Sequence, residues 1–287
     1  MLKSSFIALC LAASLFCSGA AAGASRNRQC FLPESLIALD KQNVAGGKGT
    51  LHGLFAFTRD RAADDEAIKE IGWMTLEKGS SIGLHAHKDN EDAYLIVEGE
   101  GVFTDGSGAQ TAVGPGAVTI ARPGQSHALA NEKDAPLLFL DIIAKNMAAD
   151  LKVVAADAKN CPQCFAAEDL IVLDKQKVAG GVGTLYGKFS FTRDQATKEQ
   201  AIKEIGWMTL KKGDSIGLHK HINNEDTYII ISGEGVFTDG TGKETIVGPR
   251  SVTIARAGDS HALRNEKDEP LVFLDLIAQN HALKVAP

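Results

Sequence analysis

The chain has no excess of basic residues. It contains 30 lysine and arginine residues against 36 aspartate and glutamate residues, which gives a net charge of −6. Proteins that bind a phosphate backbone usually present a basic face, so we expect no nucleic-acid partner. The balance of 44% hydrophobic and 23% charged residues is that of a globular protein and excludes the disordered and low-complexity classes.

Long apolar runs are also lacking, except at the extreme N-terminus. A membrane-spanning helix needs about 20 apolar residues, and no later segment reaches that length. Lys3 followed by the apolar stretch 6–16 and by small residues up to Ala24 has the pattern of a secretory signal peptide. We therefore expect cleavage near residue 24, a periplasmic or secreted protein, and no membrane span in the mature chain.

Cysteine is rare: five are present, and two of them belong to residues 1–24. The mature chain keeps Cys30, Cys161 and Cys164, the last two in the pattern C-P-Q-C. No second Cys or His pair lies near this pattern, and no βαβ pattern surrounds it, which argues against a zinc site and against a redox motif. In an oxidising compartment we expect one structural disulfide near the middle of the chain, with its pairing open.

Glycine is abundant, at 29 residues without a G-X-Y period, which indicates many tight turns and an all-β protein. Much of it belongs to an internal repeat, in which LDKQNVAGGKGTL returns as LDKQKVAGGVGTL and GEGVFTDGSG as GEGVFTDGTG. The repeat is as long as a domain, far above the roughly 20–50 residues of solenoid repeats. The repeat predicts a first domain over 30–146 and a second domain over 164–280, with an alanine-rich helical linker over 147–163 between them. The predicted signal peptide, 1–24, precedes the first domain.

Each copy reads as a series of short strands. Segments such as IKEIGWMTL, AYLIVEG and GVFTD are rich in β-branched, aromatic and aliphatic residues, and turn signals such as GEG and TDGSG separate them. Several strands at this spacing indicate a sandwich or a small barrel.

Six of the eight histidines fall at three equivalent positions of the two copies. In a strand, residues i and i+2 point to the same face, so each H-x-H pair presents two imidazoles together. A third histidine from a later strand and a carboxylate from the next strand would complete three nitrogens and one oxygen. Such a set suits Mn²⁺, Fe²⁺, Co²⁺, Ni²⁺, Cu²⁺ or Zn²⁺ and leaves coordination positions open for water or substrate. The sequence thus predicts one divalent transition metal per domain, held by these histidines: His85, His87, His127, His219, His221 and His261.

At this point the chain resembles the cupin superfamily, and within it the bicupins, which carry two barrels in one chain. The first cupin motif, glycine, H-x-H, an acid and glycine, matches Gly79, His85, His87 and Gly99 and is repeated in the second copy. The second motif matches Gly124, His127 and Asn131 and their counterparts. The resemblance implies two tandem jelly-roll β-barrels joined by a short helical linker. It also implies dioxygenase, decarboxylase, isomerase or lyase chemistry without choosing among them.

The chain departs from the motif at its acid. The glutamate position of the motif is taken by Asp92 and Asp226, and Glu91 and Glu225 stand one residue earlier. Strand alternation allows only one residue of each pair to face the metal. The distance to the following turn favours the aspartates, and a bulge would favour the glutamates instead.

Several further residues are catalytic candidates without an assigned role. The glutamate that is not coordinated would be free to act as a base. Arginine replaces the usual proline of the second motif, where it would clamp an anion or pair with an acid. A tyrosine shares strand parity with each aspartate, where it would either present its phenol to the pocket or fill the core by packing. These candidates are Glu91, Glu225, Arg122, Arg256, Tyr94 and Tyr228.

Two hypotheses on function follow. The first is an exported metal-dependent enzyme acting on a small oxygenated or anionic molecule. The second is a non-enzymatic periplasmic protein that binds metal or a carbohydrate-like ligand. A storage bicupin ranks last, because storage bicupins commonly lack the metal histidines and both sets are intact here. Assembly into a homo-oligomer is left open.

Overall fold

A computed structural model describes residues 28–280. The predicted signal peptide, residues 1–24, lies outside the described residues. The strands before the linker are β1 (Cys30–Phe31), β2 (Ile37–Gln42), β3 (Thr50–Phe57), β4 (Ile68–Leu76), β5 (Ser81–Ala86), β6 (Asn90–Glu98), β7 (Gly101–Asp105), β8 (Gln110–Val113), β9 (Val118–Ala121), β10 (Ser126–Ala130) and β11 (Leu137–Lys145).

The second half repeats this series. Its strands are β12 (Cys164–Phe165), β13 (Ile171–Val172), β14 (Lys175–Gln176), β15 (Thr184–Phe191), β16 (Ile202–Leu210), β17 (Ser215–Lys220), β18 (Asn224–Ser232), β19 (Gly235–Asp239), β20 (Glu244–Val247), β21 (Val252–Ala255), β22 (Ser260–Arg264) and β23 (Leu271–Gln279). Short 3₁₀ turns span Pro33–Ser35, Val44–Gly46, Ala158–Asn160, Ala167–Asp169 and Val178–Gly180.

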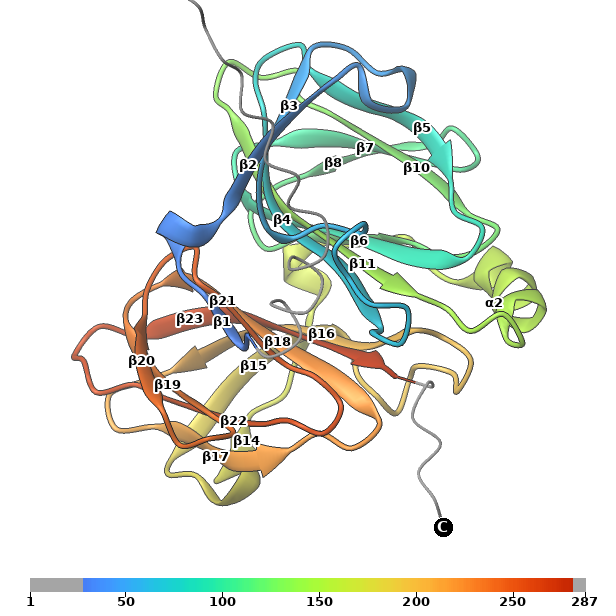
Figure 1. The fold of residues 1–287 in the computed structure, drawn as a ribbon. Coiled ribbons are helices and arrows are strands. Elements are labelled where there is room, and N and C mark those ends of the chain that lie inside the picture. The colour runs from blue at the N-terminus through green and yellow to red at the C-terminus, as the bar shows by residue number, and fades with distance from the viewer. Residues whose placement is uncertain (1–27, 281–287) are drawn as a thin grey trace, which may run out of the picture.

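The strands form two β-barrels, as predicted, which lie against each other (Figure 1). Barrel 1 combines a large sheet, β12-β9-β6-β11-β4-β3-β2, with a small sheet, β5-β10-β7-β8. Barrel 2 combines the large sheet β1-β21-β18-β23-β16-β15-β13, to which β14 is attached, with the small sheet β17-β22-β19-β20. The sequence order of neighbouring strands is that of a jelly roll.

The two barrels exchange their first strands. β1, which precedes barrel 1 in the chain, pairs with β21 of barrel 2, and β12 pairs with β9 of barrel 1. Figure 1 shows the blue β1 segment beside the orange strands of the other barrel. Backbone hydrogen bonds extend the exchange, since the amide of Ile254 donates to Gln29 and that of Ile120 donates to Gln163, each at 2.9 Å. Each repeat therefore lends its first strand to the other barrel.

The two large sheets face each other across a shared apolar core. This core takes Ile71 and Leu95 from barrel 1 and Ile205 and Leu274 from barrel 2, all fully buried. Each barrel also has its own inner core between its large and small sheets. The central strands β9 and β11 of barrel 1 and β21 and β23 of barrel 2 are thus buried on both faces, which explains why their sequences are mostly hydrophobic instead of alternating.

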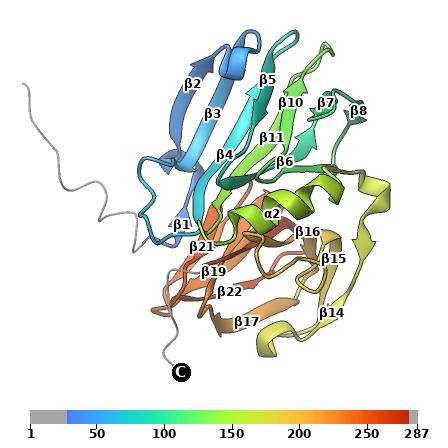
Figure 2. The same ribbon diagram turned by 90° about the vertical axis from the view of Figure 1, so that its right-hand side faces the viewer.

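The predicted linker contains the single α-helix of the described residues, α2 (Leu151–Asp157). Figure 2 shows it at the side of the molecule, beside the strands of barrel 1. It buries Val154, and the side chain of Gln125 in barrel 1 donates a hydrogen bond to the carbonyl of Ala158 at 2.6 Å. Residues 28–280 contain no helix that is long and apolar enough to cross a membrane.

The expected disulfide is absent, because Cys30, Cys161 and Cys164 are all free thiols in the structure. The strand exchange supplies the reason. Cys30 packs against the inner core of barrel 2, whereas Cys164 packs against that of barrel 1. The Cys161 thiol lies instead beside the carbonyl of Asp157, at 3.4 Å.

Candidate metal centre

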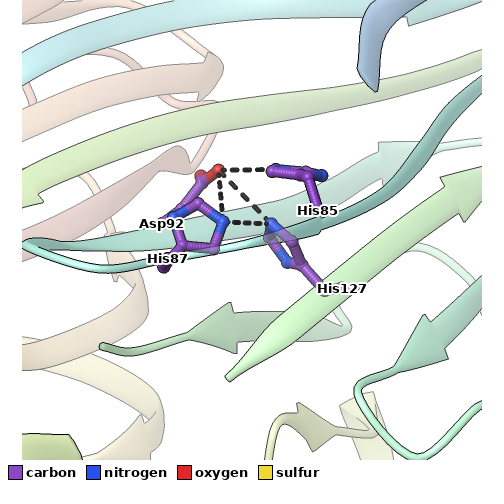
Figure 3. Close-up of side chains that lie close together, drawn as sticks. All are labelled: His85, His87, Asp92 and His127. Carbon is purple, nitrogen blue, oxygen red and sulfur yellow. Dashed lines mark hydrogen bonds and ion pairs between the residues drawn. The ribbon is translucent and has the colours of Figure 1, made fainter. Parts of the chain in front are cut away.

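Four side chains of barrel 1 converge on one point inside the barrel. His85 on β5, His87 just after it, Asp92 on β6 and His127 on β10 place one ligand atom each within 4.8 Å of the others. The Oδ2 atom of Asp92 lies 3.9, 3.6 and 3.3 Å from the Nε2 atoms of His85, His87 and His127 (Figure 3). Ligands held about 2.1 Å from one ion are separated by roughly 3–4 Å, so these spacings fit a metal site.

The imidazoles are held in the tautomer that a metal needs. The Nδ1 atom of His85 lies 2.9 Å from the Gly83 carbonyl, and that of His87 lies 2.6 Å from the Oδ1 atom of Asn90. Both partners are acceptors, so each Nδ1 carries the proton and each Nε2 turns its lone pair into the site. The Nε2 atoms of His87 and His127 face each other at only 3.0 Å, a distance that a shared cation would explain.

Barrel 2 repeats the arrangement with His219, His221, Asp226 and His261, again within 4.8 Å. The Nδ1 atoms of His219 and His221 lie 2.9 Å from the acceptors Gly217 O and Asn224 Oδ1. The Nε2 atoms of His221 and His261 are 3.0 Å apart. The chain thus carries one three-histidine, one-aspartate set in each barrel.

Burial favours the neutral, metal-binding form of three ligand histidines, whereas at His85 the contacts with Asp92 and Gly83 outweigh burial and raise the pKa. Desolvation lowers the pKa of His127 and of His261, whose side chains are fully buried. Burial and the neighbouring His261 lower the pKa of His221 to about 3. A neutral imidazole exposes a lone pair without first losing a proton, so these sites are prepared for a cation.

A second carboxyl group lies beside each aspartate ligand. Burial, reinforced by the charge of Asp92, raises the pKa of Asp141 well above its ordinary value, and Asp275 shows the same direction beside Asp226. Tyr94 stacks on His127 with ring centroids 4.5 Å apart and nearly parallel planes. These groups hold the ligand side chains in place from the inner side of the large sheet.

The site of barrel 1 opens into a cavity of about 370 Å³. Its wall includes Arg59, Lys41 and Glu70 besides the ligands His85 and Asp92. Glu70 pairs with both cations, since its Oε2 lies 3.6 Å from Arg59 Nε and its Oε1 lies 3.7 Å from Lys41 Nζ. Its Oε2 also accepts a hydrogen bond from the backbone amide of Arg59 at 3.3 Å.

In barrel 2, Glu204 holds Lys175 and the backbone amide of Arg193 in the same way. Arg193 and Asn224 line a cavity of about 550 Å³ there, whose wall includes none of the four metal-ligand candidates of barrel 2.

Comparison with known families agrees with this geometry. Residues 72–143 and 206–277 each match the family described as the cupin domain. The chain belongs to the cupin family. Because the match occurs twice and each matched segment forms most of one barrel, the protein is a bicupin.

Three similar proteins are informative. An oxalate-binding protein of Thermotoga maritima is 35% identical over 101 residues, which are 35% of this chain and 81% of that protein. The structure of an oxalate decarboxylase from Lactobacillus farciminis in complex with formate superposes with a TM-score of 0.62 and 16% identity, covering 88% of this chain and 86% of that one. An oxalate decarboxylase from Bacillus subtilis, described with Mn(II) centres, gives a TM-score of 0.56 at 18% identity, covering 88% and 78%. At these identities the structural matches concern the fold.

The structure separates the candidates of the cupin motif into two groups. Asp92 and Asp226 face the histidines, and the tyrosines Tyr94 and Tyr228 lie beside them with the predicted strand parity. Glu91 instead points to the opposite face of β6, where its carboxylate accepts hydrogen bonds from backbone amides of the other barrel. Strand alternation, with no bulge at this position, is the physical reason.

Four candidates therefore lie outside the metal sites: the glutamates are not among the ligands, and the arginines take the alternative of pairing with an acid. Glu225 repeats the position of Glu91 in the second barrel. Arg256 binds Glu225 at 2.8 Å, and Arg122 lies 3.8 Å from Glu91. These arginines pair with buried acids at the contact between barrels, so they do not reach an anion in the cavity.

Sequence reasoning missed the residues that orient and surround the ligands. Asn90 stands three residues after His87, and Arg59 lies in the FTRD segment that both copies share. That repetition was an available signal, but nothing in the spacing shows that Arg59 reaches the same cavity as His85.

Proposed function

We propose that the protein is a divalent-metal-dependent bicupin enzyme that acts on a small carboxylate anion of the oxalate class in its barrel cavities. The observation that carries the proposal is the combination in one cavity of a three-histidine, one-aspartate set with Arg59 and Lys41. A divalent ion bound there supplies Lewis-acid binding of carboxylate oxygens. The names of the relatives, an oxalate-binding protein and oxalate decarboxylases, support the same ligand class.

The cavity wall carries groups of both charges. Three side chains are cationic and four bear a carboxyl group, and burial raises the pKa of one of these, Asp141, well above its ordinary value. A bound divalent cation would add two positive charges, which favours an anionic ligand. The basic and acidic residues of the wall are Lys41, Arg59, Lys88, Glu70, Asp89, Asp92 and Asp141.

Different side chains of the cavity bind the metal, orient its ligands and bind the anion. His85, His87, His127 and Asp92 hold the metal, while Asn90 and Gly83 fix the imidazole tautomers. Arg59, kept at the wall by Glu70, binds a carboxylate of the ligand with charge-assisted hydrogen bonds.

The test is calorimetric titration of oxalate into the Mn²⁺-loaded protein, in a His219→Ala background that leaves only the first site. Arg59→Ala is expected to weaken binding by about tenfold or more, because a charge-assisted hydrogen bond contributes about 1.5–3 kcal/mol. Arg61→Ala is the matched control, since Arg61 belongs to the same loop and is exposed. Equal losses in both variants, or no oxalate binding by the loaded protein, would contradict the proposal.

Turnover separates an enzyme from a binding protein, the second candidate, which the name of the Thermotoga relative favours. Incubation of the loaded protein with oxalate is expected to release carbon dioxide or another product detectable by NMR. Tight binding without any product would establish the non-enzymatic alternative.

The export of the protein is also proposed, on the pattern of residues 1–24 alone. Mass spectrometry of protein recovered from the periplasm or the medium is expected to show a chain that begins near residue 23 or 25. Retention of Met1 in a cytoplasmic product would contradict export.

A further inference from the structure

Each metal-ligand strand carries a second carboxylate directed at the other barrel. Asp92 points into barrel 1, and its neighbour Glu91 points through the opposite face of β6 into the contact with barrel 2. Glu225, next to Asp226, does the same in the reverse direction. Both glutamates have an exposed fraction of 0%. A buried carboxylate is costly unless it is fully hydrogen-bonded, so its partners reveal what it holds.

Glu91 binds the start of a strand in barrel 2. Its Oε1 accepts hydrogen bonds from the amide of Ala201 at 2.7 Å and from Asn146 Nδ2 at 2.9 Å. Its Oε2 accepts one from the amide of Ile202, the first residue of β16, at 3.1 Å. The side chain thus joins the ligand strand of one barrel to a main strand of the other.

Glu225 binds the start of β4 in barrel 1 in the same manner. Its carboxylate accepts hydrogen bonds from the amides of Ala67 and Ile68 at 2.8 and 3.0 Å. The Nη1 atom of Arg256 and the Nδ2 atom of Asn280 each donate a further hydrogen bond to this carboxylate at 2.8 Å. The carboxylate therefore stays bound between the two barrels and has no free position left for a metal or a proton acceptor role.

The strands bound in this way lead directly to the cavity walls. In β4, Glu70 follows Ile68 by two residues and holds Arg59 at the cavity of barrel 1. In β16, Glu204 follows Ile202 by two residues and holds Arg193 in barrel 2.

A register shift lies between the two residues of each pair, at the pairing of β4 with β11 and of β16 with β23. A bulge leaves one residue unpaired and bends the strand locally, so the direction of Glu70 or Glu204 can change without unpairing the rest of the strand.

We propose that Glu91 and Glu225 are positioning residues that couple the two metal sites, so that occupancy of one site changes the affinity of the other. The inference rests on the proposed metal binding. A metal fixes Asp226 and hence β18, Glu225 passes this restraint to Ile68, and β4 carries it to Glu70 and Arg59 at the other site. A symmetric connection runs from Asp92 through Glu91 to Ile202 and Glu204. By linkage, each metal changes the affinity of the other site by the same factor.

Stepwise Mn²⁺ titration of the full metal-free chain tests the coupling. His219→Ala and His85→Ala give the affinity of each site alone. The product of the two binding constants of the unmodified chain is expected to differ from the product of these isolated constants by about fivefold or more. In the double variant Glu91→Gln and Glu225→Gln this factor is expected to fall to one, because an amide cannot accept hydrogen bonds from two backbone amides on both of its atoms.

Glu234→Gln is the matched control, since Glu234 is a surface glutamate of barrel 2 that pairs with Lys267. It is expected to leave the coupling factor unchanged. A purely structural role of the buried glutamates would lower the melting temperature and leave the factor intact. A factor of one in the unmodified chain, with two Mn²⁺ bound, would overturn the coupling alone, whereas no Mn²⁺ binding would overturn the proposed function.

If the double variant does not fold, hydrogen exchange decides the question on a chain that keeps both glutamates. In His85→Ala the intact metal set lies in barrel 2. Loading it with Mn²⁺ is expected to slow exchange at the amides of Ala67 and Ile68 in barrel 1, because both amides donate hydrogen bonds to Glu225 of barrel 2. Unchanged exchange at both amides would overturn the proposal.

Discussion

Removal of the Phe31 ring tests the strand exchange between the barrels. Phe31 is the second residue of β1, and only 4% of it is exposed. It lies opposite Val252 of barrel 2, 5.8 Å from the ring of Phe57, and belongs to the core shared by the two large sheets. Replacing a buried phenylalanine by alanine costs about 3–5 kcal/mol, through lost transfer free energy and the cavity left behind.

We therefore expect Phe31→Ala to lower the free energy of unfolding by about 3–4 kcal/mol in urea denaturation. Native-state hydrogen exchange locates the loss. The amide of Ile254 in barrel 2 donates to Gln29, just before β1, so its exchange is expected to accelerate. The matched variant is Phe165→Ala, at the equivalent position of the second repeat, where the side chain is only half-buried. Its free energy of unfolding is expected to fall by about half as much, because less apolar area is lost. The faster exchange is expected at the amide of Ile120, which donates to Gln163.

Two results would refute this reasoning. A loss below about 1 kcal/mol in Phe31→Ala would mean that β1 adds little to the shared core. Faster exchange in barrel 1, with Ile254 unchanged, would mean that β1 completes its own barrel.

Three further predictions concern the metal ligands and the exchanged strand. His85→Ala and His219→Ala are each expected to remove one metal equivalent at saturation, by elemental analysis, and loss of both equivalents from either variant would contradict two separate ligand sets. In the metal-free protein His221 is expected to contribute stability that is lost as pH falls from about 6.5 to about 3, because it takes up a proton in the unfolded chain in this range but not in the folded one. The pKa of Asp226, raised by burial to about 6, acts in the opposite sense between about pH 6 and 4. Thermal melts between pH 3 and 7 compare the unmodified chain with His221→Leu, and the unmodified chain is expected to lose more stability toward low pH than the variant. Residues 28–149 expressed alone are expected to form a dimer by exchanging β1, because a single copy would expose the core face of its large sheet; a stable monomer in light scattering would contradict that expectation.

The sequence was sufficient for the parts of the protein that obey local periodicity. The H-x-H spacing placed His85, on β5, and His87, just after it, on the same side of the chain, and the same alternation placed Asp92 and Tyr94 inside the barrel. Duplication strengthened these predictions, because each site was written twice.

Contacts between the barrels have no such local signature. Glu91 was an alternative ligand and a candidate base because it is adjacent to Asp92, and the backbone amides that it binds lie 110 and 111 residues away in the chain. The pairing of β1 with β21 rests on two residues of β1, Cys30 and Phe31, whose short pattern does not distinguish one barrel from the other. The exchange also places Cys30 and Cys164 in opposite barrels, which removes that pairing from the expected disulfide.

The central claim is that each barrel holds one divalent metal through three histidines and an aspartate. Elemental analysis of the full mature chain, purified without a metal-chelating tag, tests it most directly. We expect two equivalents of a divalent transition metal, one per barrel, and a rise in melting temperature when the stripped protein is reloaded. No bound metal, with no change in melting temperature on adding Mn²⁺, Fe²⁺, Co²⁺, Ni²⁺, Cu²⁺ or Zn²⁺, would contradict it.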